Sequence, residues 1–247
     1  MCLLNIKGWY GRAGNNFITI MNALHMNSMN GNKYRVIQWP NHQCFKVSSL
    51  TFEEGCVCGK VVTYNAMDIY FCKVENISME QTTMRMRRNM ANRYKHRILC
   101  DDILKDINTV SFDNVIHIRS GDTAHMKGGM YGTYPLEYYT NFIENVLCMD
   151  QNQKVCIVYE DDRLQTMKSL KEKYGKNQRI IWQSSSVIND INTIVRAKKL
   201  LTSPGTFSAW IPYMFSDTLE TMYLNKNRID GPPMIIDEND EIPIQWV

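Results

Sequence analysis

Residues 114 to 122, Asn-Val-Ile-His-Ile-Arg-Ser-Gly-Asp, decide the fold of this 247-residue chain. The first five are largely apolar and β-branched, which predicts a buried strand from Asn114 to Ile118. The polar residues and glycine that follow predict a loop at the carboxyl end of this strand. Ligands of open parallel sheets bind beyond the carboxyl ends of strands, so we expect a ligand at this loop.

The residue types in the loop favour a phosphate ligand. Arg119 can hold a diphosphate with a two-pronged, charge-assisted contact, and Gly121 lets backbone N–H groups approach the same oxygens. The alternative is a structural one, in which Arg119 pairs with Asp122 to stabilise the loop and His117 is a satisfied strand residue.

Helices and strands alternate regularly after this strand. They are predicted as helices at 136–147, 164–174, 189–199 and 209–215, and strands at 154–159, 179–182 and 200–202. This order predicts a parallel sheet with helices on both faces. The tail, with prolines at 232, 233 and 243, is expected to wrap the surface.

A second unit of the same kind precedes it. A strand over Leu3–Ile6, a glycine-bearing loop at Gly11–Asn16, a helix from Phe17 and a strand over Tyr34–Trp39 form a strand, loop, helix, strand unit. Residues 41 to 80 predict loops and short strands.

The stretch from Glu80 to Lys105 predicts a basic helix. Its basic residues are interpreted as a solvated face, with Met84, Met90 and Leu99 on the buried side.

The composition is that of a globular protein, with 44% hydrophobic and 21% charged residues and a net charge of +3. This balance excludes general disorder and gives no global signature of nucleic-acid binding. No stretch approaches the roughly 20 apolar residues of a spanning helix, so we expect a soluble, cytoplasmic protein. The eight cysteines are scattered and are expected to be free thiols in a reducing compartment.

Three motifs resemble those of the α1,2-, α1,6- and protein O-fucosyltransferase superfamily. His117-Ile118-Arg119-Ser120-Gly121-Asp122 resembles its His-x-Arg-x-Gly-Asp signature. Gly11-Arg12-Ala13-Gly14-Asn15-Asn16 resembles its Gly-x-x-Gly-Asn-Gln motif, with Asn16 in place of the glutamine. The segment from Ser203 to Trp210 resembles its Ser/Thr-Phe-Ser-x-Trp loop. The resemblance spans residues 3 to 216, and no motif matches between 41 and 110.

This resemblance implies a GT-B-like α/β fold of two Rossmann-like lobes with parallel sheets facing a central cleft. Residues 1–110 would form the acceptor lobe, and residues 111–247 would form the donor lobe. The implied activity is inverting, metal-independent transfer of fucose from GDP-fucose to a glycan or glycoprotein, with no cofactor.

The resemblance also implies roles for individual residues. Arg119 would stabilise charge on the departing GDP, and Asp122 and Asn15 would complete the catalytic set. The implied donor-binding residues are Gly11, Gly14, His117, Gly121, Asp190, Ser203, Thr206, Phe207 and Ser208. The general base stays open among Asp122, His125, Asp161 and Glu137.

Other functions compete with this interpretation. Glu160-Asp161-Asp162 follows a strand and could bind a divalent metal, as in metal-dependent glycosyltransferases that use another nucleotide sugar. A non-catalytic sugar-nucleotide module, or an RNA-binding surface on the basic helix, would instead bind without turnover. We expect no nucleic-acid partner, because the near-neutral chain lacks an aromatic-rich basic sheet.

Overall fold

The computed structural model describes residues 2–9, 11–52, 59–74, 76–78, 82–105, 107, 109–120, 134–225 and 242–247. The chain divides into two compact units. Unit 1 comprises residues 1–105 with 232–240, and unit 2 comprises residues 106–231 with 241–247. Each unit is described by itself.

Unit 2 is built on a parallel sheet. Its strands are β5 (Phe112–Ile118), β6 (Val155–Tyr159), β7 (Ile180–Gln183), β8 (Ala197–Leu201), β9 (Thr221–Leu224) and β10 (Ile244–Trp246). They lie in the order β10-β9-β8-β5-β6-β7, and every neighbouring pair is parallel. The chain moves outward from β5 to β7 and then returns to the other side of β5 as β8. This reversal creates a topological switch point between β5 and β8, which is where such sheets bind ligands.

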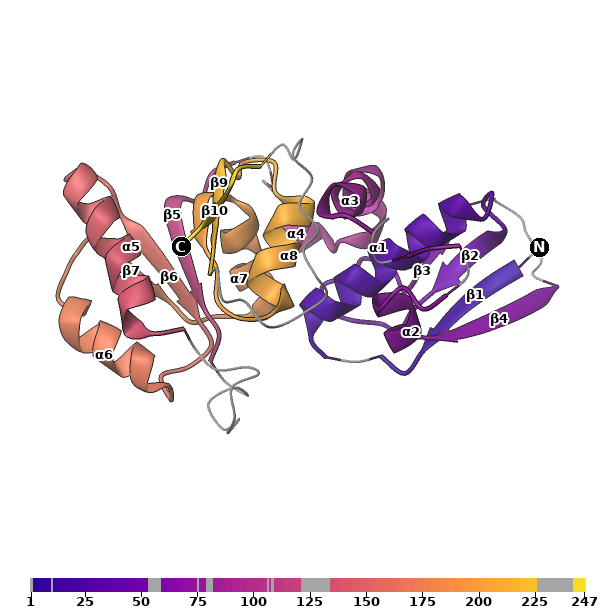
Figure 1. Cartoon of the computed structure of the whole chain (residues 1–247), viewed down its shortest axis with the longest axis horizontal. Coiled ribbons are helices and arrows are strands. Elements are labelled where there is room, and N and C mark those ends of the chain that lie inside the picture. The colour runs from indigo at the N-terminus through magenta and orange to yellow at the C-terminus, as the bar shows by residue number, and fades with distance from the viewer. Residues whose placement is uncertain are drawn as a thin grey trace. The chain divides into compact units, whose positions relative to one another are not determined.

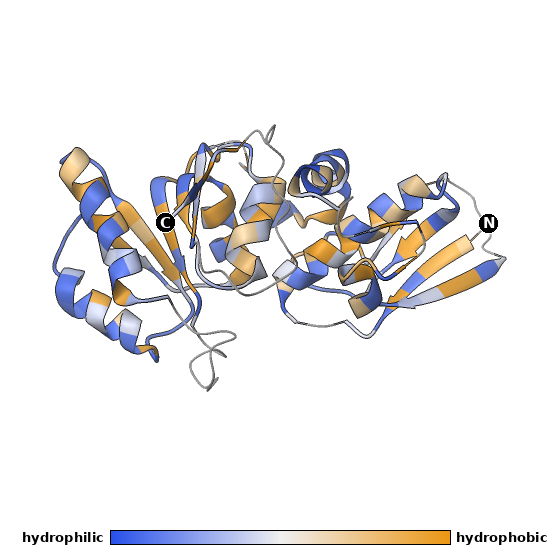
Figure 2. Cartoon of the chain, viewed as in Figure 1, coloured by the Kyte–Doolittle hydropathy of each residue, from blue (hydrophilic) through white to orange (hydrophobic). Residues whose placement is uncertain are grey.

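Helices cover both faces of this sheet. They are α5 (Leu136–Met149), α6 (Gln165–Tyr174), α7 (Val187–Val195) and α8 (Thr206–Phe215). Figure 1 shows α5 and α6 on one face and α7 and α8 on the other. Side chains such as Phe142, Ile143 and Leu170 pack from the first pair of helices onto Ile116 and Ile157 of the sheet. Hydrophobic residues accordingly follow the strands in Figure 2.

Unit 1 has a smaller, mostly parallel sheet. Its strands are β1 (Cys2–Lys7), β2 (Tyr34–Gln38), β3 (Ser49–Thr51) and β4 (Lys60–Asn65), and its helices are α1 (Ala13–Met29), α2 (Ala66–Tyr70), α3 (Met84–Ile98) and α4 (Asp101–Leu104). The strand order is β3-β2-β1-β4, with β1 parallel to both its neighbours and β3 antiparallel to β2. A second switch point therefore lies between β1 and β4. The predicted α/β class with two Rossmann-like units is confirmed.

Two predicted boundaries are wrong. The helix predicted over 80–105 is broken, because Leu99 and Cys100 adopt extended backbone angles between α3 and α4. The helix predicted over 189–199 ends at Val195, because Ala197–Lys199 pair with β5. The tail contributes an edge strand, β10, which pairs with β9.

The basic helix is only partly a solvated face. Met84 and Leu99 are buried as predicted, but Arg87 is also fully buried. Its Nε donates to Asn22 Oδ1 at 2.9 Å and its Nη1 donates to the Thr82 carbonyl at 2.6 Å. Burial lowers the pKa of Arg87 to about 10, so the guanidinium stays charged at neutral pH. This arginine therefore belongs to the interior of unit 1.

No helix within the described residues combines the length and the apolar character that crossing a membrane requires.

Candidate nucleotide-binding site

Arg119 and the loop after β8 meet at the switch point of unit 2. Arg119 directly follows β5, and a Cβ atom added to Gly205 would lie 2.3 Å from its Nη1 atom. Gly205 also has a φ of +103°, a conformation that side chains rarely adopt. Glycine at position 205 therefore brings the loop backbone against the guanidinium, directly before positions 206 to 208 of the motif.

The N-terminus of α8 lies beside this contact. Gly205, its N-cap residue, has no side chain with which to cap the helix. Thr206 and Phe207 are half-buried, whereas Ser208 to Phe215 are all buried. The first backbone N–H groups of a helix carry a partial positive charge. Together with Arg119 they form a positive region suited to phosphate oxygens.

His117, on β5, contacts two residues of this loop. Its Nδ1 lies 2.7 Å from Ser203 Oγ, and its ring lies 5.2 Å from the ring of Phe207. Burial, with a smaller contribution from the charge of Arg119, lowers the pKa of His117 to about 3. The imidazole is therefore neutral at physiological pH and adds no charge beside the guanidinium.

Ser203 and Ser208 close the same loop on itself. The Ser203 backbone N–H donates to Ser208 Oγ at 3.1 Å, and Ser208 Oγ donates back to the Ser203 carbonyl at 3.3 Å. Both residues are buried. The structure thus places these two hydroxyls and His117 in a bracing network, and leaves Thr206 and Phe207 as the more accessible residues of the motif.

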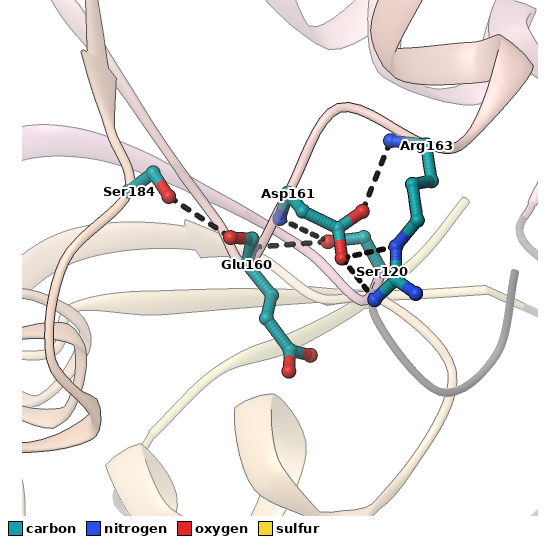
Figure 3. A network of polar contacts seen from close by, with 5 residues as sticks. All are labelled: Ser120, Glu160, Asp161, Arg163 and Ser184. Carbon is teal, nitrogen blue, oxygen red and sulfur yellow. Dashed lines mark hydrogen bonds and ion pairs between the residues drawn. The ribbon is translucent and has the colours of Figure 1, made fainter.

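The ends of β5, β6 and β7 are joined by serine hydroxyls. Ser120 Oγ accepts hydrogen bonds from the backbone N–H groups of Glu160 and Asp161 at 3.0 and 2.9 Å, and Ser184 Oγ donates to the Glu160 carbonyl at 2.9 Å (Figure 3). Ser120 is fully buried. These bonds fix the backbone that follows Arg119.

Asp190 lies on α7 near the end of β7. Its Oδ1 accepts from Gln183 Nε2 at 3.1 Å and from Ser185 Oγ at 3.0 Å. Burial raises the pKa of this carboxyl, and the charge of Glu160 raises it further. Two carboxylates thus neighbour each other on the β6 and β7 side of the site, where they can accept hydrogen bonds from hydroxyl or N–H donors of a ligand.

The two aspartates offered as metal ligands carry cationic partners. Asp161 accepts from the Nε and Nη2 of Arg163, as Figure 3 shows, and Asp162 pairs with Lys171 at 2.7 Å. Within the described ranges, no three His, Cys, Asp or Glu side chains are grouped so that they could share a metal ion. The observed partners make Asp161 and Asp162 poor candidates for metal ligands.

The base candidates are only partly described. Asp122 and His125 lie outside the described residues, as does Gly121, which was predicted to bind the donor. Asp161 is held by Arg163, and Glu137 is exposed in the first turn of α5.

The first motif lies at the switch point of unit 1. Gly11 has a φ of +71°, and an added Cβ there would lie 2.2 Å from Asn15 Nδ2. Asn15 is half-buried in the first turn of α1, and its Oδ1 lies 3.5 Å from the Tyr70 hydroxyl, a long hydrogen bond. Gly8, at the end of β1, approaches the Asn65 side chain at the end of β4 in the same way. The side-chain amide of Asn15 thus lies at the edge of the sheet where β1 and β4 end.

The other two positions of this motif face inward. Gly14 and Asn16 are both buried in the first turn of α1. No hydrogen-bond partner for Asn16 Oδ1 is found in the part of the chain that the structure describes.

Sequence reasoning missed three residues that position the site. Gly205, Ser120 and Gln183 carry no charge and were not singled out, although the first two lie inside quoted motifs. A glycine directly before a helix and after an apolar strand is a signal that could have identified Gly205.

Comparisons with known proteins concern the fold. No protein-family model matches the sequence, and a search of curated proteins gives no match. Solved structures of glycosyltransferases are similar at low identity. The E. coli heptosyltransferase WaaC with ADP has a TM-score of 0.48 and 8% identity, over 100% of this chain and 93% of that one.

Two further structures show similarity of the same extent. POFUT1 in complex with GDP has a TM-score of 0.48 and 10% identity, over 90% of this chain and 97% of that chain. The dodecameric iron-containing glycosyltransferase TibC from enterotoxigenic E. coli has a TM-score of 0.46 and 13% identity, over 94% of this chain and 61% of that chain.

Proposed function

We propose that this protein is a glycosyltransferase that binds a nucleoside diphosphate sugar at the carboxyl edge of the unit 2 sheet. The observation that carries the proposal is the contact between Arg119 and Gly205 at the start of α8, at the switch point between β5 and β8. This arrangement combines a guanidinium with helix N–H groups, which together suit a diphosphate better than either does alone.

The bond that breaks in such a transfer is the one between the anomeric carbon of the sugar and the β-phosphate oxygen. The electron pair of this bond moves to the departing diphosphate, so negative charge grows where Arg119 lies. A positioned donor of this kind contributes about 3 to 4 kcal/mol to the lowering of the barrier. Arg119 is thus proposed as the principal catalytic residue, without a metal ion.

The other predicted donor-binding residues would have different roles, according to where each lies. Thr206 and Phe207, half-buried at the helix start, would contact the donor directly. His117, Ser203 and Ser208 would hold the loop in shape through their mutual contacts. Asp190 would accept hydrogen bonds from the nucleoside, because its carboxyl is already oriented by Gln183 and Ser185.

The finer proposal is that the donor is GDP-fucose and that transfer inverts the anomeric centre. Its support is the motif resemblance, with Arg119 and the Thr206–Ser208 loop adjacent as that resemblance requires. Asn15 of unit 1 would then orient the acceptor, a glycan or glycoprotein, while Gly11 and Gly14 keep the donor-binding role that the resemblance implies. Asp122 remains the proposed catalytic carboxylate of the signature motif.

A donor screen tests the function. The purified protein is incubated with GDP-fucose, GDP-mannose, ADP-heptose and UDP-glucose, with and without a chelator, and nucleotide release is measured. The proposal expects release from GDP-fucose that the chelator leaves unchanged. Release from another nucleotide sugar would change the proposed donor sugar or its nucleobase. Release that the chelator abolishes would overturn the proposed independence from a metal ion.

Arginine variants test the residue that carries the proposal. Arg119→Lys should lower turnover by about 10²-fold or more, because an ammonium group cannot reproduce the planar fork. Arg196→Lys is the matched control. Arg196 is also half-buried, but it lies directly before β8, at the amino ends of the strands rather than at their carboxyl ends. Equal turnover in the two variants would remove Arg119 from the mechanism.

A further inference from the structure

Cys44 and Cys100 lie opposite each other in unit 1, 56 residues apart in sequence. Phe45 and Leu99 form an isolated antiparallel bridge. The bonds that flank this bridge run from the Lys46 N–H to the Ile98 carbonyl at 2.6 Å and from the Cys100 N–H to the Cys44 carbonyl at 3.1 Å. The two cysteines are therefore the next facing pair after the bridge.

Facing residues of an antiparallel pair direct their side chains to the same side. Their Cα atoms are about 5.5 Å apart in a hydrogen-bonded pair, and disulfides span Cα separations of about 4.4 to 6.8 Å. The side chains are also close enough for the charge of Cys100 to contribute to the raised pKa of Cys44, after the larger effect of burial. Geometry thus permits a direct bond between the two sulfur atoms.

The two thiols differ in access. Cys44 is fully buried, whereas Cys100 is half-buried at the residue that precedes α4. Burial and the neighbouring charge raise the pKa of Cys44 to about 12, so it is not the first thiol to react with an external reagent. Cys100 is the accessible member of the pair.

We propose that Cys44 and Cys100 form a reversible disulfide when the protein meets a low-molecular-weight disulfide such as oxidised glutathione. The Cys100 thiolate attacks one sulfur of the reagent and releases one thiolate. Cys44 then attacks the Cys100 sulfur of the mixed disulfide, and its proton passes to the second departing thiolate. The reagent is reduced to two thiols while the protein dithiol is oxidised.

The bond would add a covalent link between two parts of unit 1 that already meet through the backbone bonds of the bridge and the Lys46–Asp101 ion pair at 2.7 Å. Cys44 belongs to the segment after β2, in which Phe45 packs edge-on against Phe17 of α1 with ring centroids 4.9 Å apart. Cys100 joins α3 to α4. Oxidation would fix the segment after β2 to the α3–α4 junction, a modification site separate from the proposed donor site.

The experiment compares oxidised and reduced protein. The full chain is treated with oxidised glutathione or with dithiothreitol, free thiols are alkylated, and digested peptides are identified by mass spectrometry. We expect a peptide pair linked through Cys44 and Cys100, and a melting temperature about 5 to 10 °C higher than in the reduced protein. Dithiothreitol should reverse both changes.

Variants make the result specific. Cys100→Ser should abolish both the linked peptide and the rise in melting temperature, and Cys44→Ala should do the same while leaving Cys100 glutathionylated. Cys148→Ser is the control, because Cys148 is exposed and should not affect either readout. Linkage of Cys100 to another cysteine, or an unchanged rise in Cys100→Ser, would overturn the proposal; if Cys44→Ala does not fold, Cys100→Ser decides.

Discussion

The two units of this protein use arginine in opposite ways. Arg87 of unit 1 is fully buried, with its Nε donating to Asn22 and its Nη1 to the Thr82 carbonyl. Arg119 of unit 2 is half-buried at the carboxyl edge of its sheet, beside the N-terminus of α8. A side chain of the same type therefore lies in the interior of one unit and at the carboxyl edge of the sheet in the other, and position relative to the switch point distinguishes them.

The comparison predicts first that removing Arg87 costs stability. Arg87→Met leaves buried oxygen atoms of Asn22 and Thr82 without their charged donor, which should lower the free energy of unfolding by about 3 kcal/mol. Chemical denaturation measures the change. Arg85→Met on the exposed side of the same helix should stay within about 0.5 kcal/mol. A similar stability for both variants would mean that burial of Arg87 has no structural purpose.

Gly205→Ala tests the loop that lies against Arg119 in unit 2. The added methyl group would meet the Arg119 guanidinium, and φ at this position is strained for alanine. Turnover should fall by about 10²-fold, equivalent to about 2.7 kcal/mol of transition-state stabilisation. Kinetics with the donor found by the screen measure it. Gly31→Ala is the control for glycine replacement itself, because Gly31 has a φ of +64° and a Cβ added there meets nothing within 4 Å. Normal turnover in Gly205→Ala would show that the loop need not approach Arg119.

A smaller effect is expected at the switch point of unit 1. Asn15→Ala removes the amide beside Gly11 and should raise the KM for the acceptor about tenfold, while donor binding stays unchanged. Asn65→Ala, at the end of the neighbouring strand, provides a comparison because its side chain caps α2. Loss of donor affinity in Asn15→Ala, without a change in acceptor KM, would reverse the assignment of the two units.

A further prediction concerns the dependence of stability on pH. The pKa of His117 is lowered to about 3 in the folded protein, against 6.5 for an unperturbed histidine. Between these values the unfolded chain binds the proton and the folded chain does not, so stability falls as pH falls from 6.5 toward 3. The slope from one such group is at most about 1.4 kcal/mol per pH unit. His117→Asn should show a shallower loss in denaturation curves at pH 7, 6 and 5, and equal slopes in both proteins would contradict the pKa.

The sequence predicts unit 2 better than unit 1 for a physical reason. The strand at 114–118 is buried on both faces, so its composition is diagnostic, and the charged residues after it mark its end. The edge strand β4, Lys60–Asn65, has four exposed and two half-buried residues, so its composition gives little signal. The start of β8, Ala-Lys-Lys, favours a helix locally, and only pairing with β5 makes it a strand.

The candidate site is likewise only partly predictable from the sequence. Arg119 and the loop at 203–208 are recognisable because each follows an apolar strand. The interior role of Arg87 depends on Asn22, 65 residues away, and no local pattern contains that information. The bracing roles of Ser203 and Ser208 likewise appear only when their hydroxyls are seen to bond within the loop.

The most direct test of the account is calorimetric binding of GDP and of guanosine to wild-type protein, Arg119→Ala and Arg196→Ala. If Arg119 and the start of α8 hold the diphosphate, Arg119→Ala should weaken GDP binding by about tenfold or more, with guanosine binding unchanged and Arg196→Ala behaving as wild type. GDP affinity that is the same in all three proteins would contradict the account.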